Sequence, residues 1–161
     1  MAPTFVVDAS VVVDFLAPME DSVGSERFMR GLSWPEPITL VAPDIVFLES
    51  ANALRNLALR RVISRQRADR AAVALVRMPI ASVPCSSVVE GAWALSRTVT
   101  AYDGAYLSLA RGLDVNYVTK DRPAARAAKQ MGIRALHVGD ADFGVLMDSL
   151  EPPSSRRGPS A

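Results

Sequence analysis

The sequence has little cysteine, little histidine and almost no net charge. Cys85 is the only cysteine among 161 residues, which excludes an internal disulfide and a cysteine-rich metal site. The formal net charge is +1, so the whole chain does not attract polyanions and any basic surface must be local. An unpaired cysteine is compatible with reducing surroundings, and we expect a cytoplasmic protein.

Long apolar runs are also absent. None approaches the ~20 residues that a membrane-spanning helix needs, and the first residues lack the positive charges of a secretory signal. We therefore expect no association with a membrane. The length predicts a single domain over residues 1–150. Residues 151–161 are rich in Pro, Ser, Arg and Gly, which predicts a flexible C-terminal tail.

The most informative stretch is the aliphatic run 5–13, into which Asp8 and Ser10 are set. Such a run predicts a strand buried on both faces, as in a parallel sheet. Asp and Ser favour helix starts, so the strand should end near Asp8. In an open α/β sheet, ligands bind at the carboxyl ends of the strands. Further strands are predicted at 39–42, 80–83, 115–119 and 133–138, and helices separate nearly all of them, so the fold class is α/β with a mainly parallel central sheet.

Capping residues set the predicted helix boundaries. Asp44 should cap a helix that runs from residue 45 to about 62, and Ser64 the next one. Thr100 opens a helix that Gly112 should close, and Gly132 should close a later one.

Four acidic residues lie where apolar elements begin or end, or interrupt an apolar helix face. If the fold brings them together, their carboxylates repel one another and some stay protonated. Hard divalent cations relieve that repulsion, and Mg²⁺ takes one or two carboxylates, several waters and phosphate oxygens as ligands. Such a site lowers the pKa of a bound water and stabilises charge on a phosphate. The four residues are Asp8, Glu49, Asp103 and Asp121.

Each of these acids also has a purely structural interpretation. Asp8 and Asp121 fit helix N-caps, and Thr100 with Asp103 fits a capping box. Glu49 fits a solvated helix position, although its neighbours are apolar. From the residues alone, the pattern predicts an acidic pocket in an α/β protein and does not identify a substrate.

Four segments, taken in order, resemble the motifs of PIN-domain proteins, and the overall size and layout resemble VapC toxins of bacterial toxin–antitoxin systems. The resemblance extends over about residues 4–138, and it implies a three-layer α/β/α sandwich and a metal-dependent endoribonuclease. The segments are FVVDASV (5–11), PDIVFLESANAL (43–54), TAYDGAYLSLA (100–110) and YVTKDRPA (117–124).

The resemblance also implies roles for individual residues. It makes Asp8, Glu49, Asp103 and Asp121 the catalytic quartet that holds Mg²⁺ or Mn²⁺. Ser10 and Thr119 match small hydroxyl residues that support the site. Asn52 follows Glu49 by one helical turn, so it is expected to orient that carboxylate or to touch the substrate.

The implied partners are an RNA substrate, a small cognate antitoxin and a second copy of the chain in a homodimer. Metal-free RNA cleavage commonly needs imidazole groups, and the single histidine, His137, sits without a partner motif and fits a structural role. Basic side chains near the acids are candidates for RNA contact because an acidic pocket must still attract phosphate. These are Lys120, Arg122, Arg55 and Arg60.

Two other classes remain as alternatives. A non-catalytic PIN-like binding or scaffold module would not need the complete acidic quartet. A receiver-type signalling domain would need paired acids directly after the first strand, where only Asp8 is found, and Glu49 would not sit on a helix.

Overall fold

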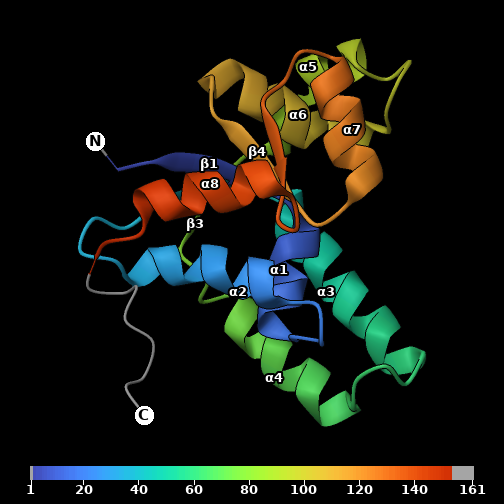
Figure 1. Ribbon diagram of the computed structural model, residues 1–161. Helices are drawn as coiled ribbons and strands as arrows, with labels where there is room; N and C mark the ends of the chain where they lie inside the picture. The colour runs from blue at the N-terminus through green and yellow to red at the C-terminus, as the bar shows by residue number, and fades with distance from the viewer. Residues whose placement is uncertain (1, 154–161) are drawn as a thin grey trace.

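A five-stranded parallel sheet forms the centre of the computed structural model, which describes residues 2–153. The strand order is β3-β2-β1-β4-β5, and every neighbouring pair runs parallel (Figure 1). This arrangement confirms the predicted α/β class. The strands are β1 (Thr4–Val7), β2 (Thr39–Pro43), β3 (Ile80–Val83), β4 (Asn116–Thr119) and β5 (Ala135–His137).

Helices connect the strands and cover the sheet. Figure 1 shows α1 to α4 gathered in one part of the molecule and α5 to α7 in another, with strands between them. The helices are α1 (Ala9–Leu16), α2 (Val23–Arg30), η1 (Gly31–Ser33), α3 (Ile45–Leu59), α4 (Arg65–Leu75), η2 (Cys85–Ser87), α5 (Val89–Ala94), α6 (Ala101–Leu113), α7 (Arg122–Gln130) and α8 (Ala141–Leu150).

The sheet topology fixes the position of the site. The chain places β2 and β3 on one side of β1 and then crosses to place β4 and β5 on the other. The strand order therefore reverses between β1 and β4, and in open α/β sheets the crevice at that point is where ligands bind. Val7 pairs with Val118, so Asp8 and Thr119 follow at the same edge of the sheet.

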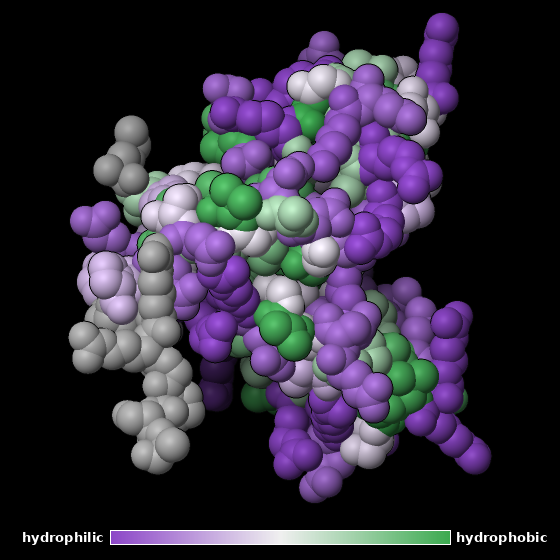
Figure 2. All heavy atoms as spheres, in the orientation of Figure 1, coloured by the Kyte–Doolittle hydropathy of each residue, from purple (hydrophilic) through white to green (hydrophobic). Residues whose placement is uncertain are grey.

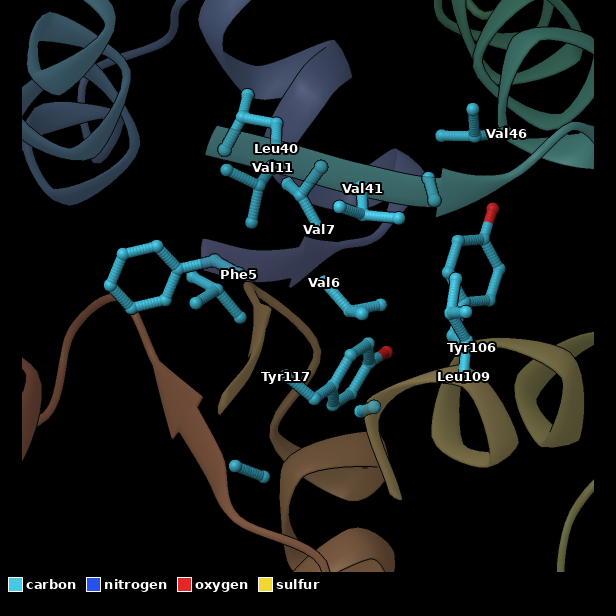
Figure 3. Close-up of a cluster of buried hydrophobic side chains, with 14 of the residues drawn as sticks. Phe5, Val6, Val7, Val11, Leu40, Val41, Val46, Tyr106, Leu109 and Tyr117 are labelled. Atoms are coloured by element: carbon cyan, nitrogen blue, oxygen red, sulfur yellow. The ribbon is translucent and has the colours of Figure 1, made fainter. Parts of the chain in front are cut away.

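The core forms because β1 is apolar on both faces. Figure 3 shows Val7 pointing toward Val11 and Val6 pointing toward Tyr117, so the strand is packed from above and below. The Phe5 ring meets the Phe28 ring edge-on at 5.3 Å between centroids. A slip of one residue would move every side chain of β1 to the opposite face of the strand, so packing on both faces sets the register at Asp8.

Two predicted caps behave differently in the structure. Asp44 precedes α3, but its carboxylate makes no bond to that helix and instead accepts a hydrogen bond from the Cys85 backbone (3.1 Å). Gly112 lies inside α6 rather than after it, and Asp114 adopts the left-handed conformation that ends this helix (φ 54°). Both differences arise because tertiary contacts and local backbone geometry override capping preference.

The predicted C-terminal tail lies largely outside the described residues, which end at Pro153. Glu151, the first residue of that tail, accepts a hydrogen bond from Arg27 (2.9 Å). Within residues 2–153, no helix is long and apolar enough to cross a membrane.

Candidate active site

A cavity of about 680 Å³ opens at the carboxyl edge of β1 and β4, between α1, α3, α6 and α7. Figure 2 shows the surface hollowed between the part that carries α7 and the part that carries α3 and α4. All four predicted acids line this cavity, although they come from four separate segments of the chain. They are Asp8, Glu49, Asp103 and Asp121.

Asp8 is the buried centre of the site, with only 8% of its surface exposed. Its Oδ1 accepts hydrogen bonds from the backbone (3.0 Å) and the hydroxyl (2.5 Å) of Ser10. Its Oδ2 accepts from the hydroxyls of Tyr117 and Thr119, each at 2.5 Å. Burial raises the pKa of Asp8, and these hydrogen bonds act against the shift because they stabilise the carboxylate. The side chain is therefore fixed in orientation.

The two predicted supporting hydroxyls connect Asp8 to the turn after β4. The Ser10 hydroxyl accepts from the backbone N–H of Lys120 (2.8 Å), and the Thr119 hydroxyl accepts from that of Asp121 (2.9 Å). The two hydroxyl oxygens are 3.3 Å apart. Ser10 and Thr119 thus hold the β4–α7 turn, and Asp121 with it, in a set position relative to Asp8.

Glu49 projects from α3 and accepts a hydrogen bond from the hydroxyl of Tyr106 on α6. Its pKa is raised because burial disfavours the charged form and because the charges of Asp103 and Asp8 repel it. Glu49, Asp103 and Asp8 are thus close enough to interact electrostatically. Burial and the bond to Glu49 raise the pKa of Tyr106 as well, so this phenol stays a proton donor.

Sequence reasoning missed the two tyrosines as site residues. Neither Tyr106 nor Tyr117 is among the site residues that the sequence predicts. A signal was available for the second, because Tyr117 precedes Thr119 by two positions in β4 and such residues point to the same face of a strand. Burial and the nearby Asp8 raise the pKa of Tyr117, so it too remains a donor.

Asp103 and Asp121 combine cavity lining with helix capping. The Thr100 hydroxyl donates to Oδ2 of Asp103 (2.8 Å) and accepts from its backbone N–H (3.2 Å), which is a capping interaction. Oδ1 of Asp121 accepts from the backbone of Ala124 (2.9 Å) and caps α7. The structural interpretation of these two residues is therefore correct, and it is compatible with a second role because both carboxylates also line the cavity.

The basic residues predicted to contact RNA lie in different environments. Lys120 lines the cavity, but its ammonium is held by Asp14 (2.7 Å) and Asp21 (2.9 Å). Burial lowers the pKa of Lys120, yet these ion pairs outweigh it and the net shift is upward. The ammonium of Lys120 is thus paired with two carboxylates at the edge of the cavity, and its contact with RNA stays a prediction.

Of the other polar residues predicted near the site, Arg60 and Asn52 line the cavity. Asn52 is exposed, and the carboxylate of Glu49 is oriented by Tyr106 instead of by this amide. Arg55 is exposed on α3, and Arg122 pairs with Asp140 (2.7 Å) and faces a second cavity.

The donor set suits a hydrated divalent cation. Among residues 2–153, no three His, Cys, Asp or Glu side chains are grouped closely enough to hold a metal ion directly. Mg²⁺, however, keeps several of its waters and needs only one or two protein carboxylates. The acids that line the cavity provide carboxylate oxygens, the ligands that Mg²⁺ prefers. Lys120 does not neutralise these acids, because its ammonium is paired with Asp14 and Asp21. The remaining carboxylates thus fit an ion that binds partly through water.

This fold and this acidic edge agree with the family comparison. The chain belongs to the PIN-domain family, whose model, described as "PIN domain", matches residues 5–130.

Within that family, the chain is 38% identical over 123 residues to Ribonuclease VapC1 of Mycobacterium tuberculosis, covering 76% of this chain and 89% of that protein. Two solved structures share the fold. PAE2754 from Pyrobaculum aerophilum has a TM-score of 0.61 at 21% identity and covers 93% of this chain and 98% of its own. VapBC2 from Rickettsia felis, solved bound to a DNA fragment from its promoter, has a TM-score of 0.56 at 11% identity. The match covers 83% of this chain and 98% of that one. The resemblance predicted from the four motifs is confirmed.

Proposed function

We propose that the protein is an endoribonuclease that depends on Mg²⁺ or Mn²⁺ and acts as the toxin of a toxin–antitoxin pair. The observation that carries the proposal is the convergence of four acids on one cavity in a PIN-domain chain. The relationship to Ribonuclease VapC1 supports RNA as the substrate. A non-catalytic module is disfavoured because no member of the quartet is missing.

In the proposed mechanism, one or two carboxylates among Asp8, Glu49 and Asp103 would bind the divalent ion directly, and the others would bind it through its water ligands. When bound, the ion supplies an acidified water and charge stabilisation at the scissile phosphate. Asp8 needs little reorganisation for this task because Ser10 and Thr119 already fix its carboxylate. Asp121 lines the same cavity at the start of α7 and orients the attacking water.

The tyrosines complete the arrangement. Tyr106 and Tyr117 donate to Glu49 and Asp8, which stabilises the ionised carboxylates that a cation needs as ligands. Both phenols come from apolar elements, α6 and β4, so they also exclude water from the inner side of the site.

The proposed partners follow from the chemistry of the same cavity. A small antitoxin that inserts an arginine would pair with the acidic cluster and block substrate access. The VapBC2 structure gives a precedent for the same fold in an assembly of this kind. We also propose that residues 1–150 act as one PIN domain and that the protein forms a homodimer in the cytoplasm.

The proposal is tested by incubating total RNA with the purified full-length protein and mapping the new ends. We expect cleavage with Mg²⁺ or Mn²⁺, none with excess chelator, and recovery when the metal is restored. Asp103→Asn should abolish cleavage, whereas Asp114→Asn, at the opposite end of the same helix, should not. Cleavage that persists unchanged in chelator would contradict metal dependence.

A further inference from the structure

A second cavity of about 460 Å³ lies on the other side of α7 from the acidic one. Its lining is mainly basic, with three cations and one carboxylate. The cations are Arg122, Arg126 and Lys129, and the acid is Asp140.

The geometry of α7 separates the two cavities. Positions three, four and seven residues apart share a helix face, so Arg122, Arg126 and Lys129 project to one side. Asp121 and Ala124 line the acidic cavity instead. Asp121 and Arg122 are consecutive, and consecutive Cα atoms are ~3.8 Å apart. The basic cavity therefore adjoins the acidic one at the start of α7.

The cations of this cavity are available to a ligand. Arg122 pairs with Asp140 at 2.7 Å, but 61% of its side chain is exposed, and exposed ion pairs exchange partners at little cost. Lys129 is 3.9 Å from Asp142, a loose contact. Arg126 is exposed and has no ion pair among residues 2–153. The hydrogen bond and the charge of Arg122, together with the charge of Lys129, lower the pKa of Asp140, as expected in a positive field.

His137 lines the cavity, is largely buried and has hydrogen-bond partners at both ring nitrogens. Its Nδ1 accepts from the backbone of Gly139 (3.0 Å), so its Nε2 carries the proton and donates to the Lys120 carbonyl (3.0 Å). A β-carbon at Gly139 would lie 3.1 Å from Cε1 of His137 and 3.5 Å from Nη2 of Arg122. Because Gly139 has no side chain, the edge of the Arg122 guanidinium beside it stays accessible to a ligand.

We propose that this basic cavity binds a phosphodiester of the RNA strand beside the bond that is cut in the acidic cavity. The inference rests on the proposed ribonuclease function and assigns Arg126 and Lys129 as substrate-binding residues. Four carboxylates repel phosphate, so a neighbouring basic anchor supplies the attraction that the cleavage site lacks. The volume suits a phosphate with part of its nucleotide.

The test compares two double variants that each remove two positive charges. Arg126→Ala/Lys129→Ala alters the cavity, whereas Arg77→Ala/Arg97→Ala removes exposed arginines that line neither cavity. Fluorescence anisotropy gives the Kd for a labelled single-stranded RNA of about 12 nucleotides, in chelator and over a range of salt. We expect the cavity variant to bind about 10-fold more weakly, with a salt slope smaller by ~0.7 for each RNA phosphate that the variant leaves unneutralised. The control variant should match the wild type.

Cleavage kinetics with Mg²⁺ separate this inference from the proposed function. The cavity variant should raise KM with little change in kcat, because Arg126 and Lys129 do not touch the reacting atoms. Equal Kd, salt slope and KM in the two double variants would overturn the inference but leave the proposed nuclease activity intact. A cavity variant that loses only antitoxin binding, with RNA binding unchanged, would overturn it in the same way. A wild-type protein that cleaves no RNA would instead remove the proposed function and the inference with it. Single Arg126→Ala, at an exposed position, repeats the test if the double variant melts early.

Discussion

The hydroxyl of Thr119 donates a 2.5 Å hydrogen bond to Oδ2 of Asp8, a residue 111 positions earlier in the chain. The parallel pairing of Val7 with Val118 brings the two together at the ends of β1 and β4. The same hydroxyl accepts from the backbone of Asp121 (2.9 Å). One buried side chain therefore sets the distance between two members of the acidic quartet.

Thr119→Val should lower cleavage activity and stability together. The methyl group keeps the volume but removes the donor to Asp8 and the acceptor for Asp121, and unsatisfied buried groups cost about 1–3 kcal/mol. Removing such a supporting hydrogen bond typically lowers metal affinity or activity by about 10- to 100-fold. Urea unfolding and cleavage rates at several Mg²⁺ concentrations measure the two effects. Thr98→Val, at an exposed position, serves as the control, and equal activity of both variants would contradict the positioning role.

Lys120→Met should destabilise the protein by about 3 kcal/mol, because removing one partner leaves a buried charge uncompensated. Asp14 is that charge: its side chain is 3% exposed, and it depends on Lys120 at 2.7 Å. The matched control is Arg65→Ala, which breaks an exposed pair with Asp69 and should cost under about 0.5 kcal/mol. Equal midpoints for the two variants in urea unfolding would argue against an internal ion pair at Lys120.

The pH dependence of stability should have opposite signs at Glu49 and Asp21. The pKa of Glu49 is raised by burial, so the folded state binds this proton more tightly than the unfolded state. Without metal, the stability of the wild type relative to Glu49→Gln should therefore fall as pH rises above ~4.3, the unfolded value, toward the raised folded pKa.

The pKa of Asp21 is lowered by its bond to Lys120, so the reverse holds there. The extra free energy of unfolding of the wild type over Asp21→Asn should be complete above pH ~3.9, the unfolded value, and should be lost as pH falls through the lowered folded pKa. Unfolding free energies for both pairs in chelator, over a pH series, provide the check. The same slope at both sites would be inconsistent with the electrostatics of the cavity.

A divalent ion should raise the melting temperature of the wild type, because a ligand that binds only the folded state stabilises it. At about 100 times the Kd, the gain is ~2.7 kcal/mol, or several degrees for a protein of this size. Asp103→Asn should lose most of the Mn²⁺-dependent shift. Asp114→Asn should retain it, because Asp114 lies at the other end of α6 and pairs with Arg134. An undiminished shift in Asp103→Asn would place the ion elsewhere.

Much of the sheet could be predicted because its strands are short apolar runs with clear ends. The aliphatic run predicts Asp8 at the carboxyl end of a central strand, and β1 ends at Val7. The sequence could not predict that the four acids converge, only what would follow if they did, because periodicity does not show which strands are neighbours. The strand order, with β4 beside β1, is the tertiary fact that brings Asp121 to Asp8.

Other features of the site depend on tertiary contacts that no local pattern encodes. The position of Lys120 beside Asp121 predicts a phosphate contact, which remains to be tested, and it does not indicate that Asp14 and Asp21 bind the ammonium. Tyr106 is not among the predicted site residues; its ring is buried, and its hydroxyl donates a hydrogen bond to Glu49. In both cases the sequence indicates burial or charge, whereas the partner is set by how separate helices pack.

The most direct measurement is the single-turnover rate of RNA cleavage with saturating Mg²⁺ by the wild type and by Asp8→Asn. Asparagine keeps the size of the side chain but removes the charge at the centre of the acidic cavity. We expect a loss of at least about 100-fold, comparable to removing a principal electrostatic group from an active site. Asp69→Asn, an exposed residue on α4, should cleave like the wild type. Cleavage by Asp8→Asn at the wild-type rate would contradict the assignment of this cavity as the active site.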